Sequence, residues 1–96
     1  MHIEFRDKKL KKCYQSEKER KKALQEKADR FYNLIKKLEA MENSHELFTQ
    51  HKYLRPHPWE DGRTSLDITG NSRLMFFFKK DEKNEEYIEI DEIYSH

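Results

Sequence analysis

The sequence predicts a single α+β domain, and three observations support this prediction. An apolar stripe with helical spacing runs through residues 10–38. Segments between residues 64 and 91 instead alternate apolar and polar side chains, as half-buried strands do. The length of 96 residues suits one compact unit with one thin core. We therefore expect residues 1–96 to form one domain of order β-α-α-β-β-β, with two N-terminal helices packed on one face of a small, mainly antiparallel sheet.

The N-terminal part is expected to begin as a strand and to continue as helix. Residues 2–5 alternate, with Ile3 and Phe5 on one side. The helical stripe that follows consists of Leu10, Cys13, Tyr14, Leu24, Ala28, Phe31, Leu34, Ile35 and Leu38. Ser16 and Glu19 have the spacing of a capping box, which satisfies free backbone amides at a helix start, so a second helix is expected from there. This helix is expected to end near residue 43, and one further turn can follow over residues 44–47.

A constrained loop or edge segment is expected over residues 51–63, and a hairpin is expected after it. Pro56 and Pro58 flank His57 and exclude a regular helix from residues 51–63. The turn signal Gly70-Asn71 separates two alternating runs, Thr64–Thr69 and Ser72–Lys79, and residues 87–91 alternate again.

The parity of the second hairpin strand assigns its side chains to two faces of the sheet. The helices are expected to cover the face that carries Leu74, Phe76 and Phe78. The opposite face, which is left available for a ligand, carries Arg73, Met75 and Phe77.

Composition favours a folded protein in a reducing setting. Charged residues make up 41% of the chain against 34% hydrophobic residues, but six Phe, five Tyr and one Trp indicate a core. Cys13 is the only cysteine, which excludes an internal disulfide. No apolar run is long enough for a signal peptide or a membrane span. We therefore expect a cytoplasmic location and no membrane partner.

The charge is unevenly distributed along the chain. Residues 1–40 contain 13 Lys or Arg and seven Asp or Glu, whereas residues 41–96 contain seven and 12. A basic helical half suits a polyanion such as RNA. A solvated lysine-rich helix face explains the same pattern, so both interpretations stay open.

Four side chains are candidates for catalysis: His57, Arg73, Tyr94 and His96. The sequence has no paired zinc-ligand spacing, no P-loop and no GxGxxG, so no metal or cofactor is expected, and Cys13 fits the helix stripe as a core residue. Cleavage of RNA suits such a set because the ribose 2′-hydroxyl is an internal nucleophile. A base takes its proton, an acid protonates the departing 5′-oxygen and a cation stabilises the phosphorane.

Each candidate also has a structural interpretation. Arg73 can be a cross-strand partner of Asp67 or Glu89, and His57 can be a rigid turn residue between prolines. Tyr94 can close the core as an aromatic plug. His96 can belong to a frayed chain end or to the remnant of a tag.

The chain resembles the RelE/HigB-like toxins of bacterial type II toxin-antitoxin systems, especially the HigB branch of plasmid-maintenance killer proteins. The resemblance covers nearly the whole length. It rests on the ordered combination of Ile3–Leu10, His57-Pro58, Gly62–Ile68, Asn71–Phe76 and the final His96. It implies a RelE-like fold and a ribosome-dependent endoribonuclease that cleaves messenger RNA without a metal. The basic N-terminal helices are expected to contact ribosomal RNA, and a cognate antitoxin is expected to neutralise the enzyme.

The resemblance also implies roles for individual residues. The histidine of the family's His-Pro motif falls on His57, the strand arginine on Arg73 and the terminal histidine on His96. Tyr94 takes the tyrosine of an ending that commonly reads Asp-Tyr-His, although Ser95 separates the two residues here.

The loop after the His-Pro motif differs from the family. Relatives often have Leu-Lys-Gly-Asp where this chain has Trp59-Glu60-Asp61-Gly62, which places an acid where the lysine stands. Contacts to RNA are expected from Lys52, Arg55, Arg63 and Trp59. Trp59 either stacks on a base or packs under the loop.

Two other functions remain open at this stage. A toxin of the ParE branch has the same fold but binds DNA gyrase and needs neither histidine, because fold alone does not fix function. A non-catalytic RNA-binding or partner-binding module is the second alternative. Met75 and Phe77 are expected to contact the antitoxin, because a partner that covered these hydrophobic side chains would also block Arg73.

Overall fold

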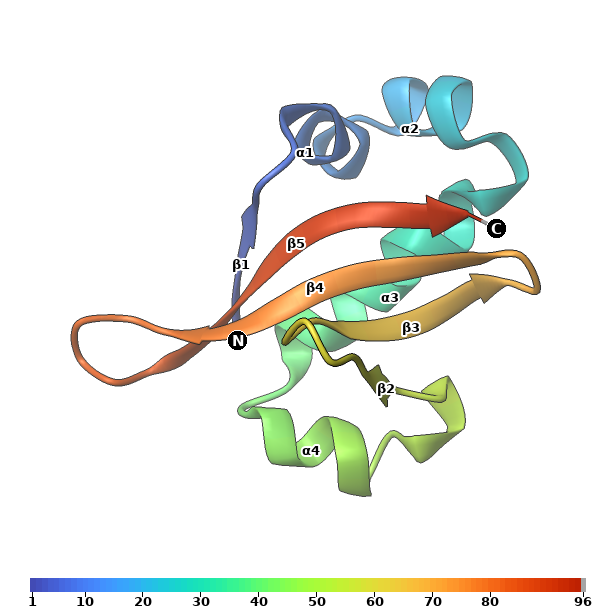
Figure 1. Ribbon diagram of the computed structural model, residues 1–96. Coiled ribbons are helices and arrows are strands. Elements are labelled where there is room, and N and C mark those ends of the chain that lie inside the picture. The colour runs from blue at the N-terminus through green and yellow to red at the C-terminus, as the bar shows by residue number, and fades with distance from the viewer. Residues whose placement is uncertain (96) are drawn as a thin grey trace.

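The structure, a computed structural model, describes residues 1–95 and has the expected α+β class. Its sheet has the strand order β1-β5-β4-β3-β2, in which β1 runs parallel to β5 and the other neighbours are antiparallel. The strands are β1 (His2–Phe5), β2 (His57–Pro58), β3 (Thr64–Thr69), β4 (Ser72–Lys80) and β5 (Glu86–Ser95). Figure 1 shows one helix, α3, behind the sheet. We call the opposite side, which faces the viewer, the open face.

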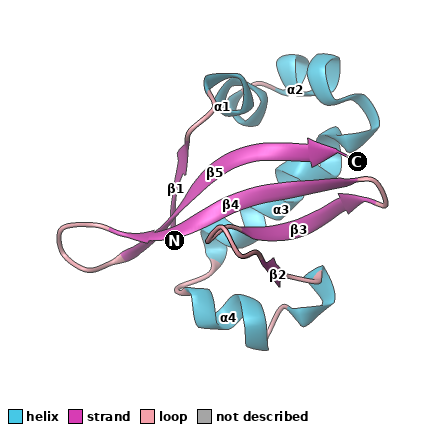
Figure 2. Ribbon diagram, viewed as in Figure 1, coloured by secondary structure: helices cyan, strands magenta, loops and turns pink. Residues whose placement is uncertain are grey.

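The helical part is more divided than expected (Figure 2). The helices are α1 (Lys8–Gln15), α2 (Glu17–Leu24), α3 (Ala28–Ala40) and α4 (Ser44–Thr49), with 3-10 turns η1 (Gln25–Lys27) and η2 (Lys52–Leu54). The two expected N-terminal helices are three, because Gln25 adopts a φ of 50° and ends α2 before α3 begins. Neither Gly nor Pro marks this break in the sequence. The short strand β2 lies at the edge of the sheet, within the segment 51–63 that was expected to be a constrained loop or an edge segment.

Side-chain caps fix where the first two helices start. The Asp7 carboxylate accepts hydrogen bonds from the N–H groups of Lys9 (2.7 Å) and Leu10 (3.4 Å). The Ser16 hydroxyl accepts one from Glu19 N–H at 3.3 Å, which confirms the predicted start of α2. These bonds satisfy amides that have no partner within the helix.

The hydrophobic core lies between α3 and the sheet. On α3 the fully buried side chains are Phe31, Leu34, Ile35 and Leu38, and on the strands they are Leu66, Leu74, Phe76, Ile88 and Ile90. Each such side chain contributes about 1.5–3 kcal/mol to folding when it leaves water. The parity prediction for β4 is therefore confirmed for its helix-facing side.

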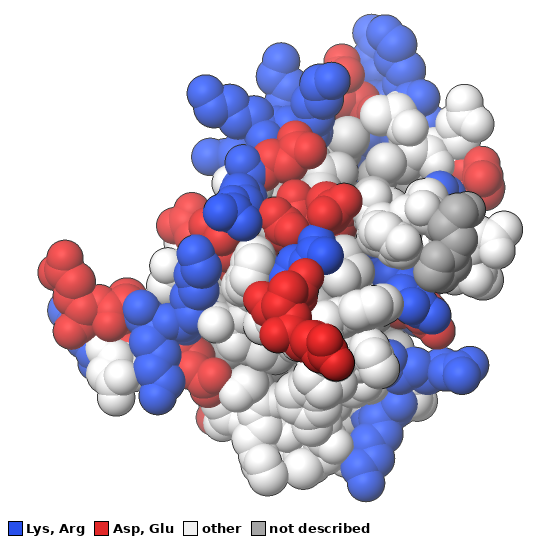
Figure 3. All heavy atoms as spheres, in the orientation of Figure 1, with Lys and Arg blue, Asp and Glu red and all other residues white. Residues whose placement is uncertain are grey.

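Helix α2 is peripheral and buries none of its residues. Arg20 connects it to the rest of the molecule. Its side chain donates hydrogen bonds to the carbonyls of Cys13 (3.1 Å) and Tyr14 (3.0 Å). Its Cζ atom lies 4.1 Å from the ring centroid of Tyr32. Figure 3 shows Lys and Arg gathered over α1 and α2. Among the described residues, no helix combines the length and the apolar character needed to cross a membrane.

A β-bulge divides strand β5 into two halves. Phe76 pairs with Ile90, but Met75 pairs with Glu92, so Asp91 is the extra residue. Without the bulge, strict alternation from Ile88 and Ile90 would turn Tyr94 toward α3. The bulge reverses the alternation and places Tyr94 on the open face.

Candidate functional site

Three polar side chains from adjacent strands share one end of the open face. Arg73 of β4 pairs directly with Asp67 of β3 and with Tyr94 of β5. Side chains at directly opposed positions of neighbouring strands point to the same face. Tyr94 is 40% exposed. Two of the predicted catalytic residues, Arg73 and Tyr94, are thus neighbours on this face, and Asp67 lies on the other side of Arg73.

Arg73 and His57 line the same cavity, which has a volume of 290 Å³. Its other walls are Arg55, Pro56 and Asp67. The volume lies at the small end for ligand pockets, and the walls carry two guanidinium groups, an imidazole and a carboxylate. This size and lining suit a small anion better than a large apolar ligand.

Asp67 forms ion pairs with both arginines of this cavity. Arg73 Nε lies 3.3 Å from Oδ1 of Asp67, and Arg55 Nε lies 3.9 Å from Oδ2. Arg55 has a left-handed backbone (φ 58°) directly before Pro56, a conformation that is uncommon for a residue other than Gly and Asn. The chain thus holds a strained backbone where the Arg55 side chain enters the cavity.

Trp59 lies beside the cavity and packs onto the sheet. Its Nε1–H donates a 2.9 Å hydrogen bond to Ser65 Oγ, its ring meets His57 edge-on with centroids 5.0 Å apart, and Arg73 Cζ lies 5.6 Å from the ring centroid. These contacts agree with the expectation that Trp59 packs under its loop, and not with the expectation that it stacks on a base. Both His57 and Arg73 are thus in contact with the same ring.

Met75 is buried, which corrects the expectation that it is a bare hydrophobic side chain awaiting a partner. Its side chain is 1% exposed, and its cross-strand neighbour Ser65 is equally buried and bonded to Trp59. Met75 is therefore already buried within the chain and is not exposed for an antitoxin to cover. Phe77 stays partly exposed, with Arg6 Cζ 5.6 Å and Lys79 Nζ 5.5 Å from its ring centroid.

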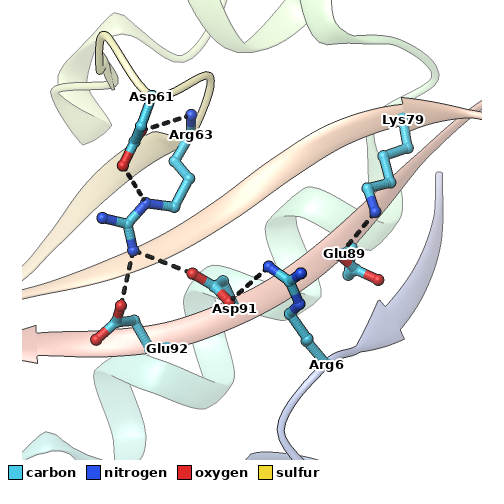
Figure 4. Close-up of polar contacts among 7 residues, drawn as sticks. All are labelled: Arg6, Asp61, Arg63, Lys79, Glu89, Asp91 and Glu92. Carbon is cyan, nitrogen blue, oxygen red and sulfur yellow. Dashed lines mark hydrogen bonds and ion pairs between the residues drawn. The ribbon is translucent and has the colours of Figure 1, made fainter.

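Arg63 is bound by three carboxylates, as Figure 4 shows. Its guanidinium lies 2.8 Å from Asp61, 3.0 Å from Asp91 and 2.7 Å from Glu92. Partial burial opposes the charged form, but hydrogen bonds to Glu92, Asp61 and Asp91 raise the pKa of Arg63. We expected a guanidinium free for RNA. In the structure, Arg63 instead connects its loop to β5 through ion pairs with Asp91 and Glu92.

The loop that carries Arg63 closes as a tight turn. Trp59 N–H donates to the carbonyl of Arg63 at 2.7 Å, and Gly62 N–H donates to the carbonyl of Trp59 at 3.1 Å. Gly62 has a φ of 91°, which side chains rarely tolerate. The remaining predicted RNA contact, Lys52, is exposed at the start of η2, three residues before Arg55.

The remaining residues considered from the sequence are His96 and Cys13. His96 lies outside the described residues. Cys13 is buried in the core cluster, and desolvation raises the pKa of its thiol, in agreement with its interpretation as a core residue. Among residues 1–95, no group of three or more His, Cys, Asp or Glu side chains is arranged to hold a metal ion.

A larger cavity of 960 Å³ lies between β1 and the β4–β5 hairpin. Its walls include the acidic side chains of Glu4, Glu42, Asp81, Glu85, Glu86 and Glu89. Such a lining repels the phosphates of a nucleic acid. Size alone therefore does not identify the place where a polyanion binds.

Sequence reasoning named Asp67 as a possible cross-strand partner of Arg73, and the structure confirms this pair, but it did not assign Asp67 to the functional site. Alternation in Thr64–Thr69 puts Asp67 on the side opposite Leu66 and Ile68, which is the side of Arg73. Arg55, which was expected to bind RNA, lies in the wall of this cavity. Comparison of the chain with protein-family models, curated proteins and solved structures gives no match.

Proposed function

We propose that the protein is the toxin of a bacterial type II toxin-antitoxin system, an endoribonuclease that cleaves messenger RNA on the ribosome. The observation that carries the proposal is the shared cavity of His57 and Arg73, with Tyr94 paired beside Arg73 on the same face. The sequence resemblance supplies the class of substrate. A RelE-like arrangement of the sheet and a cytoplasmic location, where ribosomes translate, are parts of the same proposal.

The proposed reaction is internal transesterification. The ribose 2′-oxygen attacks the neighbouring phosphorus, its proton passes to a base, and the bond from phosphorus to the 5′-oxygen breaks as that oxygen is protonated. The products are a 2′,3′-cyclic phosphate and a 5′-hydroxyl. Arg73 stabilises the charge on the phosphorane, and His57 takes one of the two proton-transfer roles. Tyr94 and His96 are the candidates for the other.

The basic helices provide a second contact with RNA in this proposal. Residues 8–24 contain eight Lys or Arg and two Glu. The exposed side chains among them are Lys8, Lys9, Lys11, Lys12, Lys18, Lys21 and Lys22. Because α2 buries nothing, this surface faces solvent and suits the phosphates of ribosomal RNA.

The antitoxin is proposed to cover the open face near Phe77. Phe77 is a partly exposed aromatic ring flanked by Arg6 and Lys79, so an acidic segment with apolar side chains fits there. Met75 is not retained as a direct contact, because it is only 1% exposed.

Mapping of transcript 5′ ends after induced expression tests the proposed activity. The native chain is expected to produce new ends within translated codons. Arg73→Ala is expected to lower cutting by about 10²- to 10³-fold and His57→Ala by about 10²- to 10⁴-fold, because each removes a group that acts only in the transition state.

Two matched variants control for loss of charge and of imidazole. Lys83→Ala changes a lysine in the exposed β4–β5 turn, and His45→Ala changes an exposed histidine of α4. Both are expected to cut like the native chain. Growth arrest without new 5′ ends would instead favour the gyrase-binding alternative, and expression without any effect on growth or transcripts would favour the non-catalytic module.

A further inference from the structure

We propose that the Asp67 carboxylate occupies the place of the substrate phosphate and competes with it for Arg55 and Arg73. Asp67 is then a built-in counterion that sets the affinity of the cavity for phosphodiesters. The identity of the natural ligand rests on the proposed function. The competition itself concerns any phosphate that enters the cavity.

The geometry of the three side chains carries this inference. The two guanidinium groups come from separate elements, Arg55 after η2 and Arg73 on β4, and each faces a different oxygen of one carboxylate. A phosphodiester also presents two equivalent oxygens on one central atom and carries one negative charge. Guanidinium groups bind carboxylates and phosphates with the same fork of donors. One anion can therefore replace the other between the same two cations.

Exposure of the side chains makes the replacement feasible. Asp67 is 38% exposed, Arg73 32% and Arg55 81%. Ion pairs with this much access to water contribute little, so removal of the carboxylate is expected to change ligand affinity by about twofold to fivefold. The backbone does not need to move, because Arg30 Nε donates a 3.3 Å hydrogen bond to the Asp67 carbonyl and the strand pairing with Arg73 persists.

Binding of two non-cleavable probes, inorganic phosphate and the deoxydinucleotide dTpdT, tests the inference without any cleavage. Chemical-shift titration gives the dissociation constant for the native chain and for Asp67→Asn, which keeps the size of the side chain but removes its charge. Asp67→Asn is expected to bind both probes about twofold to fivefold more tightly.

Three further variants separate local from general effects. Glu82→Gln removes one negative charge from the exposed β4–β5 turn and is expected to bind like the native chain. Arg55→Asn keeps a residue that tolerates the left-handed backbone, and it is expected to cancel the gain when combined with Asp67→Asn. Asp67→Thr repeats the test with a side chain that favours strands, should Asp67→Asn fold poorly.

Equal or weaker binding by folded Asp67→Asn and Asp67→Thr would overturn the inference and make Asp67 a positioning residue for Arg73. Absence of binding in every variant would overturn it as well. Tighter binding by a chain that cuts no RNA would support the competition and refute only the nuclease activity, so the two proposals fail separately.

Discussion

At the scale of single residues, Asp61 holds the loop between β2 and β3 in shape. Its carboxylate accepts a hydrogen bond from the backbone N–H of Arg63 at 3.0 Å and another from the Arg63 side chain at 2.8 Å. The backbone hydrogen bond is the main cause that lowers the pKa of Asp61 below its ordinary value of 3.8. The sequence shows only an acidic residue in a loop, and the structure gives this acid a partner within the loop.

Asp61→Asn is therefore expected to lower the melting temperature at pH 7. A carboxyl group whose pKa is lowered on folding stabilises the protein above its unfolded pKa, and this contribution is lost as the pH falls through the folded value. The difference in melting temperature between Asp61→Asn and the native chain should thus be constant above about pH 5 and vanish as the pH falls below 3.8. Glu60→Gln, at the neighbouring exposed position, serves as the control. A difference that persists at pH 2 would contradict this account.

The face of the sheet to which each strand residue points was predictable from the sequence, but the burial of Met75 was not. The alternation of Ser72–Lys79 places Arg73 on the open face and Leu74 in the core, because strand parity depends only on neighbours in the sequence. Met75 was predicted on the correct face but with the wrong exposure. Met75 is buried beside its cross-strand neighbour Ser65, which accepts a hydrogen bond from Trp59, and no periodic pattern reveals the tight turn that positions Trp59.

At the scale of elements, the bulge in β5 places Tyr94 on the same face of the sheet as Arg73. Asp91 and Glu92 both approach the guanidinium of Arg63, so two adjacent carboxylates lie on the same side of the strand. Such a pair repels unless a cation lies between them. Arg63 supplies this cation, and Arg6 adds a longer contact of 3.5 Å to Asp91 (Figure 4). The loop and the bulge therefore support each other.

Arg63→Met is expected to loosen the half of β5 that follows the bulge. The free energy of unfolding should fall by about 1–3 kcal/mol, because buried or half-buried charges lose hydrogen bonds. Amide hydrogen exchange should accelerate over residues 92–95 and stay unchanged over residues 86–90. Arg6→Met, which removes the longer contact to Asp91 and the contact with the Phe77 ring but leaves Arg63 in place, should have a smaller effect. Equal exchange in the native chain and in Arg63→Met would show that the bulge does not depend on this arginine.

Element boundaries were predictable where a local signal exists. Ser16 marks the start of α2 in the sequence, because its hydroxyl caps that helix. The break at Gln25 and the bulge at Asp91 carry no such signal, since the first lacks Gly and Pro and the second depends on charges brought together by folding. The sequence therefore could not show that Tyr94 and Arg73 pair across strands, and only the register establishes it.

At the scale of the whole molecule, charge is sorted around the sheet. Basic side chains cover α1 and α2 (Figure 3), acidic ones line the cavity beside the β4–β5 hairpin, and the small cavity at the other end of the open face holds two arginines and one histidine. A nucleic acid is attracted to the first and third regions and repelled by the second. This distribution favours one direction of approach for RNA. The excess of Lys and Arg in residues 1–40 already predicted the basic helices, but it did not predict the small cavity with its two arginines.

The central claim is that the cavity of His57 and Arg73 cleaves RNA with the ribose 2′-hydroxyl as nucleophile. Its most direct test uses purified chain and ribosomes programmed with an end-labelled messenger RNA, in which a single nucleotide at the cut site is ribose or 2′-deoxyribose. We predict cutting of the ribose form, with a 2′,3′-cyclic phosphate on the upstream fragment, and no cutting at the 2′-deoxy position. Equal cutting of both forms, or cutting of neither, would contradict the claim.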